Sequence, residues 1–171
     1  WLGWLEEDIF NSKNKKELSH FRDTVFRSEF QHVVLLGMGG ATLSAEVVRD
    51  CFTPVDGFPK LHIISTLDPL ELHHVDQEID YGKTLFVVSS KSGSTLETLL
   101  LFRYFAHRFS EALGDFNGKH FIAITDLGSE LEDIATAREF DRVFLTNRHI
   151  GGTFSALSFF GLVPMCVLGL D

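Results

Sequence analysis

The 171-residue chain has few cysteines, few prolines and no long apolar run. Cys51 and Cys166 have no CxxC partner, which argues against a disulfide framework or a zinc site, and we expect both to be buried as small hydrophobic residues. The most apolar stretch, 150–170, is interrupted by glycines and by Pro164, whereas a membrane span needs roughly 20 apolar residues. We therefore expect no membrane-spanning segment.

Basic residues are also scarce, because 15 Lys and Arg stand against 24 Asp and Glu, for a formal net charge of −9 with neutral histidine. They are concentrated only at Lys13, Lys15 and Lys16. This balance disfavours nucleic-acid binding. It leaves a phosphorylated metabolite open, because amides and one or two local cations bind phosphate within a Debye length of about 8 Å.

The first ten residues lack a basic region followed by an apolar stretch and a small-residue cleavage site. We therefore expect no secretory signal and a cytoplasmic protein. With 44% hydrophobic and 23% charged residues, the composition is that of one folded globular domain.

Short runs rich in Val, Ile, Leu and Phe predict strands that are covered on both faces. These strands are 32–36, 61–64, 84–88, 120–124 and 142–145. Segments with helical spacing are 1–10, 15–30, 42–52, 69–77, 95–113, 129–137 and 155–170. The alternation predicts an α/β fold, a three-layer αβα sandwich with a five-stranded parallel sheet and right-handed crossovers.

Several predicted helices begin with capping signals. Asp68 precedes a proline at a helix start, and Ser94 and Ser129 each stand three residues before a glutamate, as in a capping box. The aromatic residues of 95–113 are expected to be packing surface.

Three loops that follow strands carry the functional signals, because ligands of parallel sheets lie beyond the carboxyl ends of the strands, where the strand order reverses. The loop 89–95 (SSKSGST) offers several hydroxyls, the ammonium of Lys91, a flexible glycine and the free amides of a helix start, which match the needs of a phosphate dianion. The alternative is an ordinary capping turn in which Glu97 is the partner of Ser94, although a cap needs no cation.

The glycines of the loop 37–42 (GMGGAT) allow a tight turn and a close approach to a ligand. A dinucleotide site is the competing interpretation, but Thr42 stands where the third glycine of GxGxxG belongs, and no acid ends the second strand. A Walker loop and a GxSxG nucleophile elbow are absent from the sequence. The third loop, 149–153 (HIGGT), is compatible with a simple turn, and its His149 either reaches a ligand or is merely solvated.

Adjacent His73 and His74 point to different sides of a helix, so they cannot form an i, i+4 metal pair. We expect both to be exposed and predict no metal site.

Taken together, the three loops resemble those of the glucose-6-phosphate isomerase family, which belongs to the sugar isomerase (SIS) fold group. Residues 37–40 (GMGG) resemble the family's GIGGS loop, 90–98 (SKSGSTLET) its SKTFTTxET phosphate loop, and 151–158 (GGTFSALS) its GGRxSxLS segment. The variant SSKSGSTLET, with HFIAITD further on, is similar to the isomerase half of transaldolase/isomerase fusion proteins. The resemblance spans about 33–171. It implies flavodoxin-like winding, with a SIS domain over 31–171 and a helical segment, 1–30, packed on it.

The resemblance implies reversible conversion of glucose 6-phosphate to fructose 6-phosphate through an enediol, a step of glycolysis and gluconeogenesis that needs no metal or cofactor. It implies a sugar-phosphate site with Glu97 at its edge as the candidate catalytic residue. The implied substrate-binding residues are Gly39, Gly40, Ala41, Thr42, Ser90, Lys91, Ser92, Ser94, Thr95 and Thr153.

The chain departs from the family pattern at two loop positions. Ala41 stands in place of a serine, and Thr153 in place of the arginine of GGRxS. Threonine cannot replace a fixed planar charge, so either another cation serves or the activity is weak or altered. A non-catalytic phosphosugar-sensing domain is the alternative that Thr153 favours.

The family's base glutamate, ring-opening histidine and catalytic lysine match no position of this sequence. We therefore expect a fragment that contains the first SIS domain and is inactive alone. It would be either a homo-oligomer or a partner of a missing second SIS domain, because an uncovered apolar surface promotes association.

Overall fold

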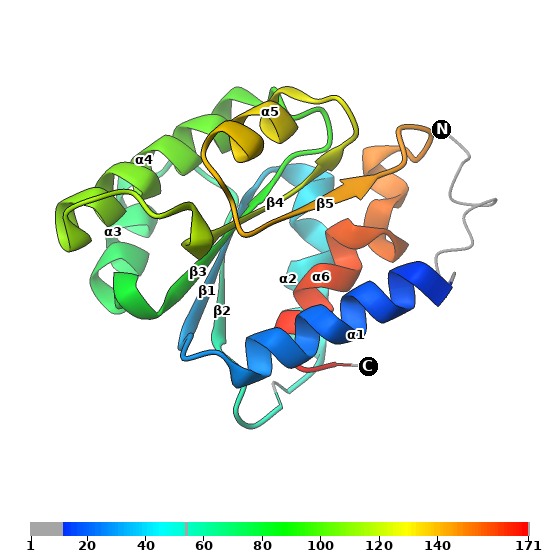
Figure 1. Cartoon of the computed structure of the whole chain (residues 1–171), viewed down its shortest axis with the longest axis horizontal. Helices are drawn as coiled ribbons and strands as arrows, with labels where there is room; N and C mark the ends of the chain where they lie inside the picture. The colour runs from blue at the N-terminus through cyan, green and yellow to red at the C-terminus, as the bar shows by residue number, and fades with distance from the viewer. Residues whose placement is uncertain (1–11, 54, 171) are drawn as a thin grey trace.

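The computed structural model describes residues 12–53 and 55–170, so the predicted helix over 1–10 lies outside the described residues. All the predicted strands are present within this part of the chain. They are β1 (His32–Gly37), β2 (Lys60–Ile64), β3 (Thr84–Ser89), β4 (Phe121–Asp126) and β5 (Arg142–Thr146). They form one parallel sheet in the order β2-β1-β3-β4-β5, which is the flavodoxin-like order (Figure 1). The predicted α/β class and winding are confirmed.

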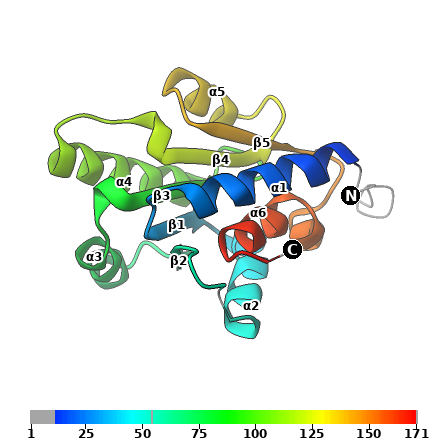
Figure 2. The same cartoon turned by 60° about the horizontal axis from the view of Figure 1, so that its bottom comes forward.

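Helices cover both faces of this sheet (Figures 1 and 2). They are α1 (Ser12–Arg27), α2 (Leu43–Cys51), α3 (Pro69–Glu78), α4 (Leu96–Leu113), α5 (Glu130–Ala137) and α6 (Phe159–Val167). Short 3-10 turns are η2 (Gly39–Ala41), η3 (Tyr81–Lys83), η4 (Gly118–His120) and η5 (Gly152–Leu157).

Alternate residues of each strand feed two separate cores, which produces the three layers. Val33 and Leu35 of β1 pack with α1, α2 and α6, whereas Val34 and Leu36 pack with α3, α4 and α5. The aromatic residues of α4 belong to the second core, where they surround stacked Phe86 and the neighbouring Phe121, whose ring centroids are 4.9 Å apart. The expected packing role of this helix is confirmed.

Two of the predicted N-caps form, although the Glu132 carboxylate accepts from the Gly128 amide and not from the Ser129 amide that a capping box uses. The Asp68 carboxylate accepts a hydrogen bond from the Leu70 amide at 2.9 Å, and the Ser129 hydroxyl accepts one from the Glu132 amide at 3.2 Å. The prediction for Ser94 was wrong: Thr95 is the residue that precedes α4, and the Ser94 side chain turns back to Ser92.

Two further predictions were wrong in part. The predicted helix over 155–170 is divided into η5 and α6, because Ser158 leaves the helical conformation and its hydroxyl caps the Phe160 amide at 3.3 Å. Cys51 is exposed at the end of α2, while Cys166 is buried as expected, and burial raises the pKa of its thiol to about 11.

His73 and His74 are exposed, as predicted. No helix in the described ranges is long and apolar enough to cross a membrane.

Candidate functional site

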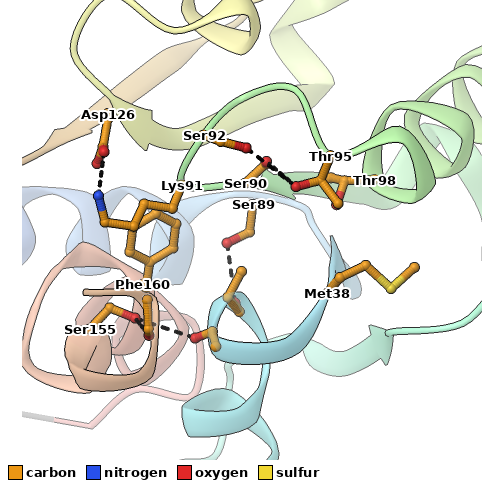
Figure 3. Close-up of a pocket in the computed structure, with 13 residues that line it drawn as sticks. Met38, Ser89, Ser90, Lys91, Ser92, Thr95, Thr98, Asp126, Ser155 and Phe160 are labelled. Atoms are coloured by element: carbon orange, nitrogen blue, oxygen red, sulfur yellow. Dashed lines mark hydrogen bonds and ion pairs between the residues drawn. The ribbon is translucent and has the colours of Figure 1, made fainter. Parts of the chain in front are cut away.

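A cavity of about 340 Å³ opens at the carboxyl ends of β1, β3 and β4 (Figure 3). The strand order reverses between β1 and β3, so the cavity lies at the switch point where parallel sheets of this kind bind ligands. Its lining consists of Met38, Gly40, Ala41, Ser89, Ser90, Lys91, Ser92, Thr95, Thr98, Asp126, Gly152, Ser155 and Phe160.

Hydroxyl groups from the loop between β3 and α4 gather on one wall of the cavity (Figure 3). The Ser90 hydroxyl lies 3.1 Å from that of Thr95, and the Ser92 hydroxyl lies 3.5 Å from it. One turn further along the helix, the hydroxyl of Thr98 is buried and has no hydrogen-bond partner among the described residues. Gly93 lets the loop turn back with a φ of +72°, at a point where a Cβ would lie 2.6 Å from the Cβ of Ser129.

The same wall includes the start of α4, a helix of 18 residues. In the described structure the Thr95 side chain caps none of its first amides. The N–H groups of the first turn of a helix have no intrahelical partner and carry partial positive charge, which favours an anion. The wall therefore combines hydroxyl donors, amide donors and a helix dipole.

Two glycine loops from distant parts of the chain form the opposite wall. A Cβ on Gly40 would lie 2.4 Å from the Gly152 carbonyl oxygen, so the backbones of the two loops touch. The Ser155 hydroxyl donates to the Gly152 carbonyl at 2.6 Å and also reaches the Gly40 carbonyl at 3.4 Å. The Ser89 hydroxyl donates to the Ala41 carbonyl at 3.2 Å and so ties the end of β3 to η2.

Lys91 and Asp126 form an ion pair at the margin of the cavity (Figure 3). The side chain of Lys91 is 24% exposed and that of Asp126 is 11% exposed. The second carboxylate oxygen of Asp126 accepts a hydrogen bond from the Thr146 hydroxyl at 2.5 Å. The lining of the cavity thus includes a cation that is paired with a carboxylate.

Six of the residues expected in the site line this cavity: Gly40, Ala41, Ser90, Lys91, Ser92 and Thr95. The others lie outside its lining. Thr42 is buried and donates to the Gly39 carbonyl at 3.2 Å, while Gly39, Ser94, Glu97 and Thr153 are exposed around the same loops. His149 is also exposed and does not line the cavity.

The lining also includes residues that are not among the individually expected site residues: Met38, Ser89, Thr98, Asp126, Gly152, Ser155 and Phe160. All of them except Asp126 and Phe160 belong to the candidate loops and family segments 37–42, 89–98 and 151–158. Asp126 is the last residue of β4 and lies two residues beyond the predicted strand 120–124, so the carboxyl-end rule could have found it. Thr98 stands three residues after Thr95, the spacing that places both on one face of a helix. The sequence carries no comparable signal for Phe160.

The family model for phosphoglucose isomerase matches residues 18–171. A glucose-6-phosphate isomerase from Chlamydia felis is 38% identical over 164 residues, which cover 93% of this chain and 29% of that protein. Among solved structures, a hypothetical protein from Thermus thermophilus matches with a TM-score of 0.89 and 29% identity over 99% of this chain and 40% of its own. A glucose-6-phosphate isomerase from Chlamydia trachomatis matches with a TM-score of 0.76 and 31% identity over 90% of this chain and 30% of its own. The chain thus spans less than half the length of each of these relatives.

Proposed function

The chain belongs to the phosphoglucose isomerase family, and on this premise we propose that it forms the sugar-phosphate-binding part of an enzyme that interconverts glucose 6-phosphate and fructose 6-phosphate. The proposal is supported by the family match and by the cavity at the switch point of the sheet. It includes a cytoplasmic role in glycolysis and gluconeogenesis. Because the chain covers 29% of the Chlamydia felis relative, we further propose that it binds the phosphate end of the sugar and is inactive alone.

The observation that carries the proposal is that the buried Thr98 hydroxyl has no hydrogen-bond partner among the described residues and lies beside the start of α4, where no side chain caps the first amides. A buried hydroxyl without a partner costs about 1–3 kcal/mol, so a binding partner from outside the chain is favoured there. In the proposed complex, a phosphate oxygen accepts hydrogen bonds from Thr98 and from the first amides of α4. The hydroxyls of Ser90, Ser92 and Thr95 bind the remaining oxygens, and Lys91 offsets the charge.

The glycine wall is proposed to take the sugar carbons. Gly40 and Ala41 line the cavity and have no side chain larger than a methyl group, so a sugar hydroxyl can approach this wall closely. We assign Gly39, Thr42, Ser94 and Thr153 to the surrounding rim, where they contact or support the ligand.

The proposed reaction moves a proton between C1 and C2 through an enediol. It needs a carboxylate base, an acid-base group that opens the ring and a cation near the developing oxyanion. Glu97, exposed in the first turn of α4, is the carboxylate that we place at the edge of the reaction site. We propose that the remaining groups come from the rest of the enzyme, and that this chain binds and orients the phosphate end.

A titration of the chain with fructose 6-phosphate and with free fructose tests the proposal, followed through the amide NMR signals of residues 90–95. We expect shifts with the phosphorylated sugar only, and weaker binding by about tenfold in Lys91→Ala, since a hydrogen bond to a charged group contributes about 1.5–3 kcal/mol. Lys119→Ala, which removes an exposed cation outside the cavity lining, is the matched control. Equal responses to both sugars, or none at millimolar phosphate ester, would contradict the proposal.

The second candidate function is a non-catalytic phosphosugar sensor. It is favoured by Thr153, which is exposed next to the cavity-lining Gly152, at the position where the family pattern has arginine. An isomerase assay on a longer protein that contains this chain separates the two functions. Turnover of fructose 6-phosphate supports the isomerase, whereas tight binding without turnover supports the sensor.

A further inference from the structure

Asp126 places a carboxylate in the lining of a cavity that is proposed to bind an anion. The residue is 8% exposed and ends β4. A buried negative charge near a phosphate opposes its binding, because Coulomb repulsion is strong where water is excluded. Its presence there therefore requires a compensating role.

The contacts of Asp126 connect it to Lys91 twice. Its carboxylate pairs with the Lys91 ammonium, and its backbone N–H donates to the Lys91 carbonyl at 3.2 Å. The other carboxylate oxygen lies 2.5 Å from the Thr146 hydroxyl, which is also 3.2 Å from the Thr125 carbonyl. Two donors thus converge on the two oxygens of one carboxylate.

The ammonium of Lys91 has a further neighbour on the loop that follows β5. It lies 3.4 Å from the carbonyl oxygen of Arg148. The Arg148 guanidinium in turn donates to the carbonyls of Leu127 at 2.8 Å and Gly128 at 3.3 Å. The loops that follow β3, β4 and β5 are therefore joined around this one ammonium group.

We propose that Asp126 is a positioning residue that holds the Lys91 ammonium at the cavity wall, so that the cation is in place before the phosphate arrives. The inference rests on the proposed function, because it assigns Lys91 to the phosphate. A free lysine side chain samples many rotamers, and fixing it in advance removes this entropy cost from ligand binding. Asp126 itself does not touch the phosphate.

The proposal and simple electrostatics predict opposite effects for Asp126→Asn. Loss of a negative charge alone would strengthen phosphate binding. Asparagine keeps one acceptor oxygen that can face Lys91, and its NH2 group can donate to the Thr146 hydroxyl. That oxygen is neutral, however, so the ion pair that holds the ammonium is lost and the ammonium is held less firmly. We expect fructose 6-phosphate to bind about fivefold more weakly, which is within the range of one ordinary lost hydrogen bond.

A double-mutant cycle shows whether Asp126 acts through Lys91. Dissociation constants for fructose 6-phosphate are measured by calorimetry for the wild-type chain, Lys91→Ala, Asp126→Asn and the double variant. We expect Asp126→Asn to weaken binding only when Lys91 is present, and to leave binding unchanged or stronger in the Lys91→Ala background. Asp126→Glu is expected to restore part of the affinity, and Glu130→Gln, an exposed charge at the start of α5, to have less than a twofold effect.

A second readout needs no ligand and keeps the inference separate from the proposed function. A paired ammonium exchanges its protons slowly enough to give a ¹⁵N NMR signal, so we expect a Lys91 Nζ signal in the wild-type chain and its loss in Asp126→Asn. Stronger phosphate binding in Asp126→Asn, equal weakening in both backgrounds, or an unchanged ammonium signal would overturn the positioning role. If the wild-type chain binds no fructose 6-phosphate, the proposed function fails, and the phosphate part of this inference fails with it. The ammonium signal still decides whether Asp126 fixes Lys91.

Discussion

The amino and carboxyl ends of the sheet both carry buried polar side chains with hydrogen-bond partners, and they differ in one group: the cavity at the carboxyl ends also contains a buried hydroxyl, that of Thr98, without a partner among the described residues. Near the amino ends, the buried Asp76 carboxylate accepts hydrogen bonds from the Tyr81 hydroxyl at 2.5 Å and from two guanidinium nitrogens of Arg108 at 2.9 Å. Burial alone would raise the pKa of Asp76, but the hydrogen bonds from Arg108 and Tyr81 lower it below its ordinary value. Every oxygen of this carboxylate is engaged within the chain.

At the carboxyl ends, the Thr98 hydroxyl is equally buried and bonds to no described residue. The Ser44 hydroxyl, in the first turn of α2, is the other buried side-chain polar atom without a partner among the described residues, and it does not line the cavity. A fully partnered polar cluster stabilises a fold, whereas an unpartnered group at a cavity favours a ligand. This contrast separates the end of the sheet that stabilises the domain from the end that we propose to bind the sugar phosphate.

Acid should act first on the amino end of the sheet. His62, 7% exposed, lies 3.1 Å from His32 through ring nitrogens, and burial, reinforced by Lys60 and opposed by Glu78, lowers the pKa of His62 to about 4. His62 therefore stays neutral in the folded state at a pH where the same side chain in the unfolded chain, with a pKa of about 6.5, is protonated. The contribution of His62 to the free energy of unfolding is complete above pH 6.5 and is lost as the pH falls toward 4. We expect a loss on the order of 3 kcal/mol from this group between pH 7 and pH 4.

Urea unfolding of the chain at several pH values measures this loss. His62→Gln removes the titrating group, and we expect its unfolding free energy to vary less with pH over the same range. His73→Gln is the control, because His73 is exposed. An unchanged pH dependence in His62→Gln would show that burial at the amino end does not govern acid stability.

The glycine wall allows a sharper comparison within the carboxyl end. A Cβ at Gly40 would lie 2.4 Å from a backbone oxygen of Gly152, whereas a Cβ at Gly152 would meet nothing within 4 Å. Gly40→Ala is therefore expected to destabilise the chain by about 2 kcal/mol, as overpacking does, and Gly152→Ala by less than about 0.5 kcal/mol. Thermal unfolding of both variants checks this order, and equal effects would mean that the two loops do not pack as closely as described.

The strands could be predicted from the sequence because a sheet covered on both faces needs continuous apolar runs such as 32–36. Short runs of this kind fit few structures other than a buried strand. The phosphate-loop candidates could be predicted because the carboxyl ends of parallel strands meet at one edge. What could not be predicted depends on contacts between distant segments. The packing of Phe160 beside the cavity and the pairing of Asp126 with Lys91 are both set by tertiary placement.

The local errors have a common cause. Ser94 and Ser158 are both favourable N-cap residues, but only Ser158 caps a helix. Ser94 does not, because Thr95 is the residue that precedes α4 and the start of this helix faces the cavity. Local propensity could not decide between them, since the choice depends on what lies in front of each helix. The sequence pattern predicts an N-cap at Ser94 that the structure lacks, and this uncapped position lies at the proposed anion site.

One pair of hydroxyl deletions tests the contrast between the two ends most directly. Thr98→Val and Tyr81→Phe each remove a buried hydroxyl, which is unpartnered at the carboxyl end and bonded to Asp76 at the amino end. We predict that Tyr81→Phe lowers the unfolding free energy by about 1–1.5 kcal/mol and leaves fructose 6-phosphate binding unchanged. Thr98→Val should keep or raise stability and weaken binding by about fivefold to tenfold. Loss of stability in Thr98→Val without loss of binding, or loss of binding in Tyr81→Phe, would contradict the division of the sheet into a stabilising end and a binding end.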